Sequence, residues 1–440
     1  MTNLEAALWS FPTLLGLIFL RVPIGLAMLT LGALGTWYVT GSWTPILAQL
    51  KSLTYTTFAS YTLSIIPLFL LMGQFATRGG LSAALFRAAA TLIGHRRGGV
   101  AMAAVGACGG FGAICGSSLA TAATMGQVAL PELRRLGYSG ALSTGALAAG
   151  GTLGILIPPS IVLVLYALLA EQNIVKLFVA ALVPGLLAAL GYMLVIALYV
   201  RLSPAAAGAS PPASMAERLD ALWRVWPVLA IFLTVIGGIY AGWFTPTEGA
   251  AIGAAGTGLA ALWNGGLDRQ GLADAIKATA TSTGMIFFVL LGAAVFNGFL
   301  AFAQLPQAAA AALAAWDASP WLILGLILLV YLVLGCVMDS LSMVLLTVPI
   351  FFPLVMLLDF GLTPEQTALW FGILVLIVVE VGLITPPVGL NLFVINGLAR
   401  DVPLAATYLG VLPFVLSDLA RVALLLAFPG VALGLVAVMF

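Results

Sequence analysis

The sequence predicts an all-α, polytopic membrane protein made of two inverted repeats. Of its 440 residues, 62% are hydrophobic and only 7% are charged, and the mean hydropathy is +1.18. Soluble domains carry about 25% charged residues, so most of this surface is not suited to water. At roughly 20 apolar residues per crossing, the chain has material for on the order of ten transmembrane spans. Related motifs also recur, in the same order, in the two halves.

The apolar stretches predict the helices. The first stretch, 4–20, has no basic residues before it and no small-residue cleavage site soon after it, so we expect a retained helix rather than a signal peptide. The more polar segments 42–60 and 268–281 are predicted to be interfacial arm helices, one in each half. Further crossings are expected at the other stretches of about one bilayer in length: 24–40, 62–77, 174–200, 225–242, 246–264, 282–303 and 404–428.

Four longer apolar regions predict interrupted helices. Stretches 137–170 and 366–399 exceed one crossing, and each contains a double proline, so we expect a proline-broken helix in each. Regions 98–133 and 319–358 are long enough for two half-helices apiece. Each of these two regions is predicted to form a re-entrant helical hairpin, which enters the membrane and returns to the same side.

Internal repetition arranges these elements into two halves. Residues 117–119 (Ser-Ser-Leu) align with 339–341 (Asp-Ser-Leu), 222 positions later, and residues 154–159 align with 382–387, 228 positions later. A segment rich in Pro, Ala and Ser lies near the midpoint and is typical of a linker. The predicted divisions are a first repeat, a linker and a second repeat: 1–202, 203–218 and 219–440.

The placement of charge orients the two halves. Arginine pairs at 96–97 and 134–135 border the first hairpin, and positive residues collect on the cytoplasmic side of a membrane. A re-entrant hairpin returns both pairs to that side, whereas one ordinary crossing would separate them. The second hairpin is bordered by acidic residues instead, namely Asp317, Asp359 and Glu365. We therefore expect it to enter from the outside, which makes the repeats inverted and places both termini outside.

The first hairpin and the first broken helix carry candidate ligands for an ion or a solute. Backbone that leaves helical geometry inside a bilayer needs polar partners, so such breaks line polar cavities. The run Gly116, Ser117 and Ser118 supplies a flexible turn, hydroxyl groups and the start of a half-helix, where anions are favoured. Residues 150–154, which include Gly151, Thr152 and Gly154, precede the double proline and offer carbonyl oxygens to a small cation. Close helix packing is the competing interpretation of these small residues.

The second half repeats this arrangement with an acidic residue. Asp339 and Ser340 occupy the second hairpin, and an ionised Asp inside a bilayer costs at least ~2.5 kcal/mol, so it needs a partner or a wet site. Gly382 and Thr385 accompany the second double proline. Glu380 lies just before it, either as a cation or proton ligand or as a brace for the broken helix, and both alternatives stay open.

Basic residues are scarce where a substrate would bind. No intramembrane Lys or Arg is evident for an anionic substrate, so helix ends and bound cations would supply the positive field. Asp418 and Arg421, three residues apart on one helix, are interpreted as a local ion pair.

The remaining reactive residues indicate neither catalysis nor a resident metal. Cys108, Cys115 and Cys336 lack CxxC spacing and are interpreted as packing residues. His95 is the single histidine and cannot supply an HExxH site, and no DDxxD or Ser/His constellation supports an intramembrane enzyme. Basic and acidic residues number 16 and 15, which gives no reason to expect a nucleic-acid partner.

At these residues the chain resembles the large membrane subunit of the tripartite ATP-independent periplasmic (TRAP) transporters, the DctM-like family. Cys115 departs from the family pattern, which more often has a small hydroxyl residue or Ala there, and the resemblance assigns no ligand role to this position. The matching stretches cover nearly the whole chain: IPLFLLMG (66–73), GHRRGGVAMAAV (94–105), GSSLATAATMG (116–126), GTLGILIPPSIVLVLYA (151–167), MDSLSMVLLTVPIFFP (338–353) and GLITPPVGLNLFV (382–394).

The resemblance implies a multi-pass importer of the bacterial inner membrane with periplasmic termini. It would carry a C4-dicarboxylate, sialic acid or another carboxylate by an elevator mechanism, with Na⁺ as coupling ion and no other cofactor. It also implies two protein partners, a small four-helix DctQ-like membrane subunit and a soluble DctP-like periplasmic binding protein. A standalone sodium:dicarboxylate or anion symporter of related architecture is the alternative.

The resemblance also assigns residues. Sodium ligands would be Gly116, Ser117, Ser118, Gly151, Thr152 and Gly154 at one site, and Asp339, Ser340, Gly382 and Thr385 at the other. Substrate contacts would come from Ser118, Thr121, Pro159, Pro387 and Asn391.

Overall fold

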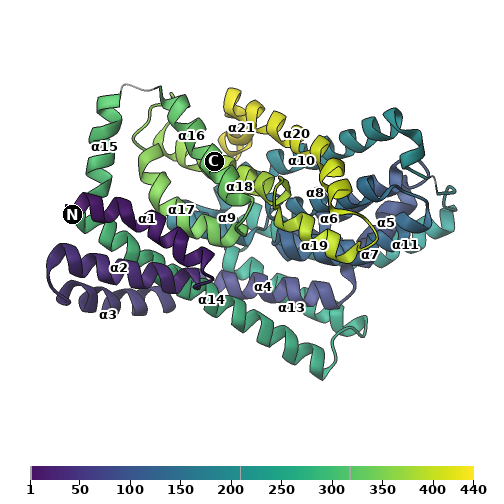
Figure 1. The fold of residues 1–440 in the computed structure, drawn as a ribbon. Helices are drawn as coiled ribbons and strands as arrows, with labels where there is room; N and C mark the ends of the chain where they lie inside the picture. The colour runs from purple at the N-terminus through teal and green to yellow at the C-terminus, as the bar shows by residue number, and fades with distance from the viewer. Residues whose placement is uncertain (1, 209, 317–318) are drawn as a thin grey trace.

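The computed structural model describes residues 2–208, 210–316 and 319–440, and every regular element within these ranges is a helix (Figure 1). The all-α prediction is therefore confirmed for the described residues. Asp317, which was expected to border the second hairpin, lies outside them.

The described residues of the first half form ten α-helices and two short 3₁₀ turns. Their bounds are α1 Asn3–Phe19, α2 Ile24–Thr40, α3 Thr44–Phe58, η1 Thr62–Ser64, α4 Ile65–Arg78, α5 Leu81–Ile93, α6 Gly99–Cys115, α7 Ser118–Arg135, α8 Gly140–Leu156, α9 Ile161–Leu169, α10 Ile174–Leu202 and η2 Pro204–Ala206.

The second half contains the remaining helices, and one of them includes a π-helical turn, η3. Their bounds are α11 Met215–Phe232, η3 Leu233–Gly237, α12 Gly238–Tyr240, α13 Pro246–Trp263, α14 Arg269–Phe302, α15 Leu305–Trp316, α16 Pro320–Gly335, α17 Ser340–Val355, α18 Pro364–Ile384, α19 Leu390–Leu398, α20 Leu404–Ala427 and α21 Gly430–Met439.

The apolar helices of the described residues differ in length. Among the described residues, five helices are long and apolar enough to cross, or seven if two bent pairs each count as one span. Helices α1 and α2 are apolar but have 17 residues each, just below this length. Further apolar sequence lies in shorter helices such as α6, α16 and α17.

The two predicted arm helices differ in the structure. Helix α3 is separate, and it meets the next helical segment at an angle of 57°. The predicted second arm, 268–281, is instead the beginning of α14, a continuous helix of 34 residues and therefore about 51 Å long. The sequence from Arg269 to Phe302 contains no proline, so nothing breaks the helix between its polar and apolar parts. The expectation of a second, separate arm was wrong.

Helix α14 packs closely on α2 through glycines. A Cβ atom on Gly32 would lie 2.7 Å from the Phe296 backbone nitrogen, and one on Gly35 would lie 2.6 Å from the Phe299 ring. Absent side chains on one helix thus make room for aromatic rings on the other, as is common between membrane helices.

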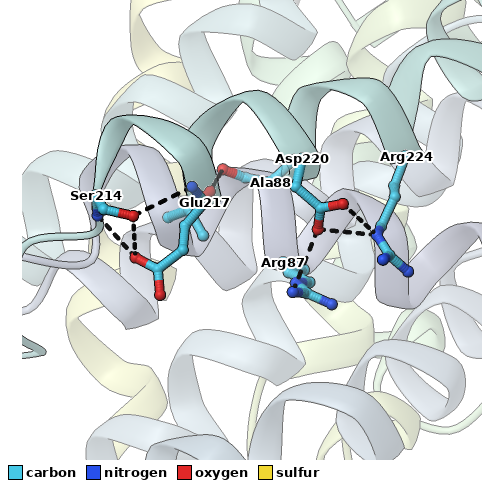
Figure 2. A network of polar contacts seen from close by, with 7 residues as sticks. Arg87, Ala88, Ser214, Glu217, Asp220 and Arg224 are labelled. Atoms are coloured by element: carbon cyan, nitrogen blue, oxygen red, sulfur yellow. Dashed lines mark hydrogen bonds and ion pairs between the residues drawn. The ribbon is translucent and has the colours of Figure 1, made fainter.

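Helix α11 begins at Met215, inside the segment predicted as linker, because Ser214 and Glu217 form a capping box. It packs against α5, a helix that the sequence did not predict. Figure 2 shows this contact: Asp220 of α11 lies between Arg224, 2.9 Å away on the same helix, and Arg87 of α5, 3.4 Å away. Both helices lie at the opposite end of the molecule from the N-terminus (Figure 1).

Candidate functional site

The turn between α6 and α7 forms the first hairpin tip. Gly116 has φ +64°, a left-handed conformation that glycine adopts without a steric penalty. Ser117 then has extended backbone, and its side chain accepts a hydrogen bond from the Ala120 amide as the N-cap of α7. Local sequence therefore ends one half-helix and starts the next within two residues.

The turn between α16 and α17, residues 336–339, forms the second hairpin tip. Asp339 is the N-cap of α17 and accepts a hydrogen bond from the Ser342 amide at 3.1 Å. A carboxylate is favourable at a helix N-terminus, where free amides and the helix dipole attract negative charge. Asp339 thus holds the second tip, in the position that Ser117 occupies in the first.

Each broken helix is interrupted beside a hairpin tip. Helices α8 and α9 are bent by 45° across residues 157–160, and the Pro158–Pro159 bond there is cis. Helices α18 and α19 are separated by residues 385–389, where the Pro386–Pro387 bond is cis. The Gly389 amide of this second break donates to the Cys336 carbonyl oxygen at 3.0 Å, which attaches the break to the second tip.

Glu380 connects the two tips. This side chain on α18 is 0% exposed, and both of its carboxylate oxygens accept hydrogen bonds from serines. Ser118, the first residue of α7, donates to Oε2 at 2.6 Å. Ser340, the first residue of α17, donates to Oε1 at 2.9 Å. The sequence left open whether Glu380 binds an ion or braces the broken helix; in the structure its carboxylate is hydrogen-bonded to a serine of each hairpin tip.

A cavity of about 230 Å³ lies between the tips. Helices α4, α8, α9 and α14 also contribute to its wall. The polar side chains that line it are Gln74, Thr77, Ser117, Ser118, Ser282, Asp339 and Ser340. None of the described residues around it is Lys or Arg.

Three of these polar residues were not anticipated from the sequence. Gln74 and Thr77 belong to α4, and Ser282 belongs to α14, both of which were expected to be ordinary crossings. A polar side chain within an apolar stretch was the available signal, although it cannot show which cavity the side chain reaches.

The glycines of α8 bring the first tip against this helix. A Cβ atom on Gly154 would lie 2.6 Å from Thr121 Oγ1 and 2.7 Å from the Ser117 carbonyl oxygen. One on Gly151 would lie 2.7 Å from Ala122 Cβ and 3.1 Å from Asn391 Nδ2. The small residues therefore serve close packing, and the same packing places oxygen atoms of the first tip beside α8.

Thr152 and Thr385 use their hydroxyl groups elsewhere. Thr152 Oγ1 lies 2.6 Å from the Ala149 carbonyl oxygen and 2.9 Å from the Tyr192 hydroxyl on α10. Thr385 donates to the Val381 carbonyl oxygen at 2.6 Å, and Gly382 packs against Gly335 of α16. Each hydroxyl group is therefore held by neighbouring residues, while its oxygen keeps lone pairs that can still accept a hydrogen bond.

The residues predicted to contact substrate are placed in different surroundings. Ser118 lines the cavity, whereas Thr121, Pro159, Pro387 and Asn391 are not part of its wall. Thr121 Oγ1 and Asn391 Oδ1 are buried without a hydrogen-bond partner, and Asn391 Nδ2 donates to the Ala148 carbonyl oxygen at 3.2 Å. The Pro159 carbonyl faces Gly116, and the Pro387 carbonyl accepts a hydrogen bond from Tyr408 at 2.5 Å.

One arginine of the described residues, Arg421, is buried, and it forms an ion pair with Asp418. Arg421 and Asp418 of α20 are 5% and 1% exposed, and their side chains are 2.8 Å apart. Tyr192 donates to the same Asp418 carboxylate at 2.7 Å, and Arg421 donates to the Pro184 carbonyl oxygen at 3.4 Å. The predicted ion pair is confirmed, and it lies inside the helix bundle rather than at its surface.

A wider groove of about 720 Å³ lies away from the tips, among α5, α11 and α13. Its rim includes the exposed indole rings of Trp223, Trp226 and Trp263. Tryptophan in such positions is typical of a membrane–water interface. The cavity between the tips, rather than this open groove, therefore combines enclosure with converging polar groups.

Apolar crossing helices, two hairpins whose tips enclose a polar cavity, and two interrupted helices beside them define a helical membrane transport protein. The chain matches the family described as "Tripartite ATP-independent periplasmic transporter, DctM component" over residues 11–431. It belongs to this family, the large permease subunits of TRAP transporters.

Three similar proteins illustrate the relationship. The C4-dicarboxylate TRAP transporter large permease protein DctM of Pseudomonas aeruginosa is 39% identical over 378 residues, which cover 85% of this chain and 86% of that protein. The sialic acid TRAP transporter large permease protein SiaM of Vibrio cholerae is 31% identical over 420 residues, covering 94% and 95%. The isethionate TRAP transporter permease protein DctMQ of Oleidesulfovibrio alaskensis is 32% identical over 385 residues, covering 87% and 59%.

The fold also resembles a solved structure of low sequence identity. The YdaH transporter of Alcanivorax borkumensis superposes with a TM-score of 0.61 at 16% identity, covering 87% of this chain and 89% of that one. At this identity the likeness concerns the fold alone.

Proposed function

We propose that this chain imports a small organic acid across the bacterial inner membrane, driven by a Na⁺ gradient and by an elevator motion. The observation that carries the proposal is the cavity of about 230 Å³ between two hairpin tips. Drug-sized ligands occupy sites of about 300–1,000 Å³, so this cavity suits a smaller molecule such as a C4-dicarboxylate.

Helix N-termini supply the attraction for a carboxylate. Ser118 and Ser340 are the first residues of α7 and α17, and both line the cavity. Free backbone amides and the positive end of the helix dipole favour anions at such positions, and serine hydroxyl groups add hydrogen bonds. The substrate is thereby bound without an arginine or lysine among the described lining residues.

Fixed negative charge at the tips explains why a cation would accompany the substrate. Asp339 lines the cavity, and Glu380 lies directly behind both tips. A carboxylate substrate adds charge of the same sign, and bound Na⁺ offsets it. The two Na⁺ sites are assigned to Gly116, Ser117, Ser118, Gly151, Thr152 and Gly154, and to Asp339, Ser340, Gly382 and Thr385.

The remaining assignments follow the same transport scheme. The repeats at 1–202 and 219–440 are proposed to be inverted, with both termini in the periplasm. In support, the outer end of the α16–α17 hairpin lies toward the end of the molecule where the N-terminus is marked, and the outer end of α7 lies toward the opposite end (Figure 1). The hairpins and broken helices would move as one body against α2, α4, α13 and α14.

Two protein partners complete the proposal. The isethionate relative is a single permease named DctMQ, of which this chain matches only part. A separate small four-helix DctQ-like subunit would therefore associate with this chain, and a periplasmic DctP-like protein would deliver the carboxylate.

Uptake by reconstituted vesicles tests the function. The chain, the small subunit and the binding protein are combined, and accumulation of radiolabelled C4-dicarboxylates and sialic acid is followed with an inward Na⁺ gradient. We expect uptake that stops when K⁺ replaces Na⁺ and when the binding protein is omitted. Equal uptake in K⁺ would exclude Na⁺ coupling, and uptake without the binding protein would favour the standalone symporter.

A further inference from the structure

Glu380 contacts two hairpins that pack on different neighbouring helices. Helix α7 packs on α8 and α19, whereas α17 packs on α9, α14 and α18, so the two tips rest on different sets of neighbours. The carboxylate of Glu380 nevertheless contacts both tips, at 2.6 Å to Ser118 and 2.9 Å to Ser340. These serines are equivalent in the two repeats, 222 positions apart.

Only one half of the molecule supplies this carboxylate. The position equivalent to Glu380 in the first repeat, 228 residues earlier, is Thr152, whose hydroxyl faces the Tyr192 hydroxyl instead. The connection is therefore not a consequence of the repeat. It joins an α18 side chain of the second half to the tip of the first half.

We propose that Glu380 is a positioning residue that clamps the two hairpin tips at one separation, so that the cavity between them keeps one shape while substrate is carried. This inference rests on the proposed function, because a fixed cavity shape matters only if the cavity holds a substrate during transport. Hydrogen bonds to a carboxylate are stronger than those between neutral groups, and two of them from one rigid helix restrain both tips together.

Three substitutions of Glu380 should affect the clamp differently. In Glu380→Gln, the amide oxygen accepts from one serine and the amide nitrogen donates to the other serine oxygen, so the connection is kept without the charge. Glu380→Asp is shorter by one methylene group and reaches at most one tip. Glu380→Ala removes both contacts.

The distance between the tips is the primary measurement. Spin labels are placed at Gln127 on α7 and at Val337 in the second tip, both exposed, after Cys108, Cys115 and Cys336 are replaced by alanine. The native residue and Glu380→Gln should give one narrow distance distribution, and Glu380→Ala and Glu380→Asp should give a broadened one. Glu365→Gln, on the same helix but exposed, is the matched control and should leave the distribution narrow.

The serines provide a second test of the same clamp. Ser118→Ala and Ser340→Ala should each broaden the distribution, and the double variant should broaden it no further, because either substitution opens the same connection. In a chain that already carries Glu380→Ala, neither serine substitution should change the distance distribution further. Ser143→Ala removes a buried hydroxyl that has no hydrogen-bond partner and serves as the serine control.

Transport kinetics give the functional readout. Glu380→Ala should raise the substrate concentration for half-maximal uptake by about 10-fold or more, and Glu380→Gln should restore most of the native value. A distribution for Glu380→Ala that superposes on the native one would overturn the clamp, as would Gln behaving like Ala. The distance measurement does not require transport. If the chain transports no carboxylate, the proposed function is wrong, but the distance distributions still test the clamp.

Discussion

Among the described residues, three acidic or basic side chains are buried in the long helices: Glu380, Asp418 and Arg421. Removing a charge from water is expensive, so each requires a specific partner. Asp418 and Arg421 satisfy each other, with Tyr192 and the Pro184 carbonyl as further partners. Glu380 accepts hydrogen bonds from the hydroxyl groups of two serines, Ser118 and Ser340. The buried charges thus have two roles. The Asp418–Arg421 pair holds α10 to α20, and Glu380 holds the hairpin tips.

The buried pair should be far more sensitive to substitution than the exposed cluster of Figure 2. Asp418→Asn leaves Arg421 buried beside an uncharged partner, and we expect a loss of about 3–5 kcal/mol in stability. Asp220→Asn weakens contacts to Arg87 and Arg224, which are all largely exposed, and such surface pairs contribute about 0–1 kcal/mol.

Thermal unfolding of the detergent-solubilised protein measures both variants. Asp418→Asn should lower the midpoint clearly, and Asp220→Asn should leave it nearly unchanged. If both variants lowered the unfolding midpoint equally, the conclusion that the buried pair contributes more stability than the exposed cluster would be wrong.

At the scale of elements, the glycine face of α8 decides how the first hairpin sits. The first tip approaches Gly154 so closely that even one methyl group would overlap Thr121 Oγ1 and the Ser117 carbonyl oxygen. Backbone atoms of a packed turn cannot give way as a flexible side chain can. The position of the tip, and with it one wall of the cavity, therefore depends on the absence of a side chain.

Gly154→Ala should displace the first tip and reduce uptake by about 10-fold or more, since misplacing binding groups by roughly 1 Å can cost about 100-fold. Helical content should be retained, because alanine favours helix over glycine. Gly284→Ala on α14 is the matched control, as no atom lies within 4 Å of its added Cβ. Uptake by the reconstituted variant and far-ultraviolet circular dichroism are the measurements; native uptake by Gly154→Ala would refute the packing argument.

The elements also show where local sequence is insufficient. Residues 268–281 are polar enough to suggest a separate surface helix, yet they continue into the apolar part of α14 because no residue interrupts the helical hydrogen bonds. In the first half, α3 and the following segment are bent by 57° after Phe58. Polarity alone does not end a helix.

At the scale of the whole molecule, topology can be tested with the three native cysteines replaced by alanine. If α6 and α7 form a re-entrant hairpin, single cysteines at Arg97 and Arg135 should react with a membrane-impermeant maleimide from one face, and a cysteine at Asp359 from the other. All three positions are exposed. Labelling of 97 and 135 from opposite faces would show that this segment crosses the membrane.

Local chemistry in the chain was sufficient to predict much of this protein. Low charge and long apolar stretches indicated a helical membrane protein, double prolines marked the interrupted helices, and the run from Gly116 to Ser118 marked a turn followed by a helix start. These features depend on near neighbours in the chain, because a proline lacks its amide proton and a glycine tolerates positive φ wherever they occur.

Contacts between distant residues were settled only by the packing of the helices. The sequence could not show that Glu380 reaches Ser118, 262 positions away, or that Gln74, Thr77 and Ser282 face the same cavity as both tips. It also could not show that Asp418 and Arg421 are enclosed by neighbouring helices. Side-chain burial and partnership depend on which helix faces lie against each other, and that is a property of the folded arrangement rather than of any segment.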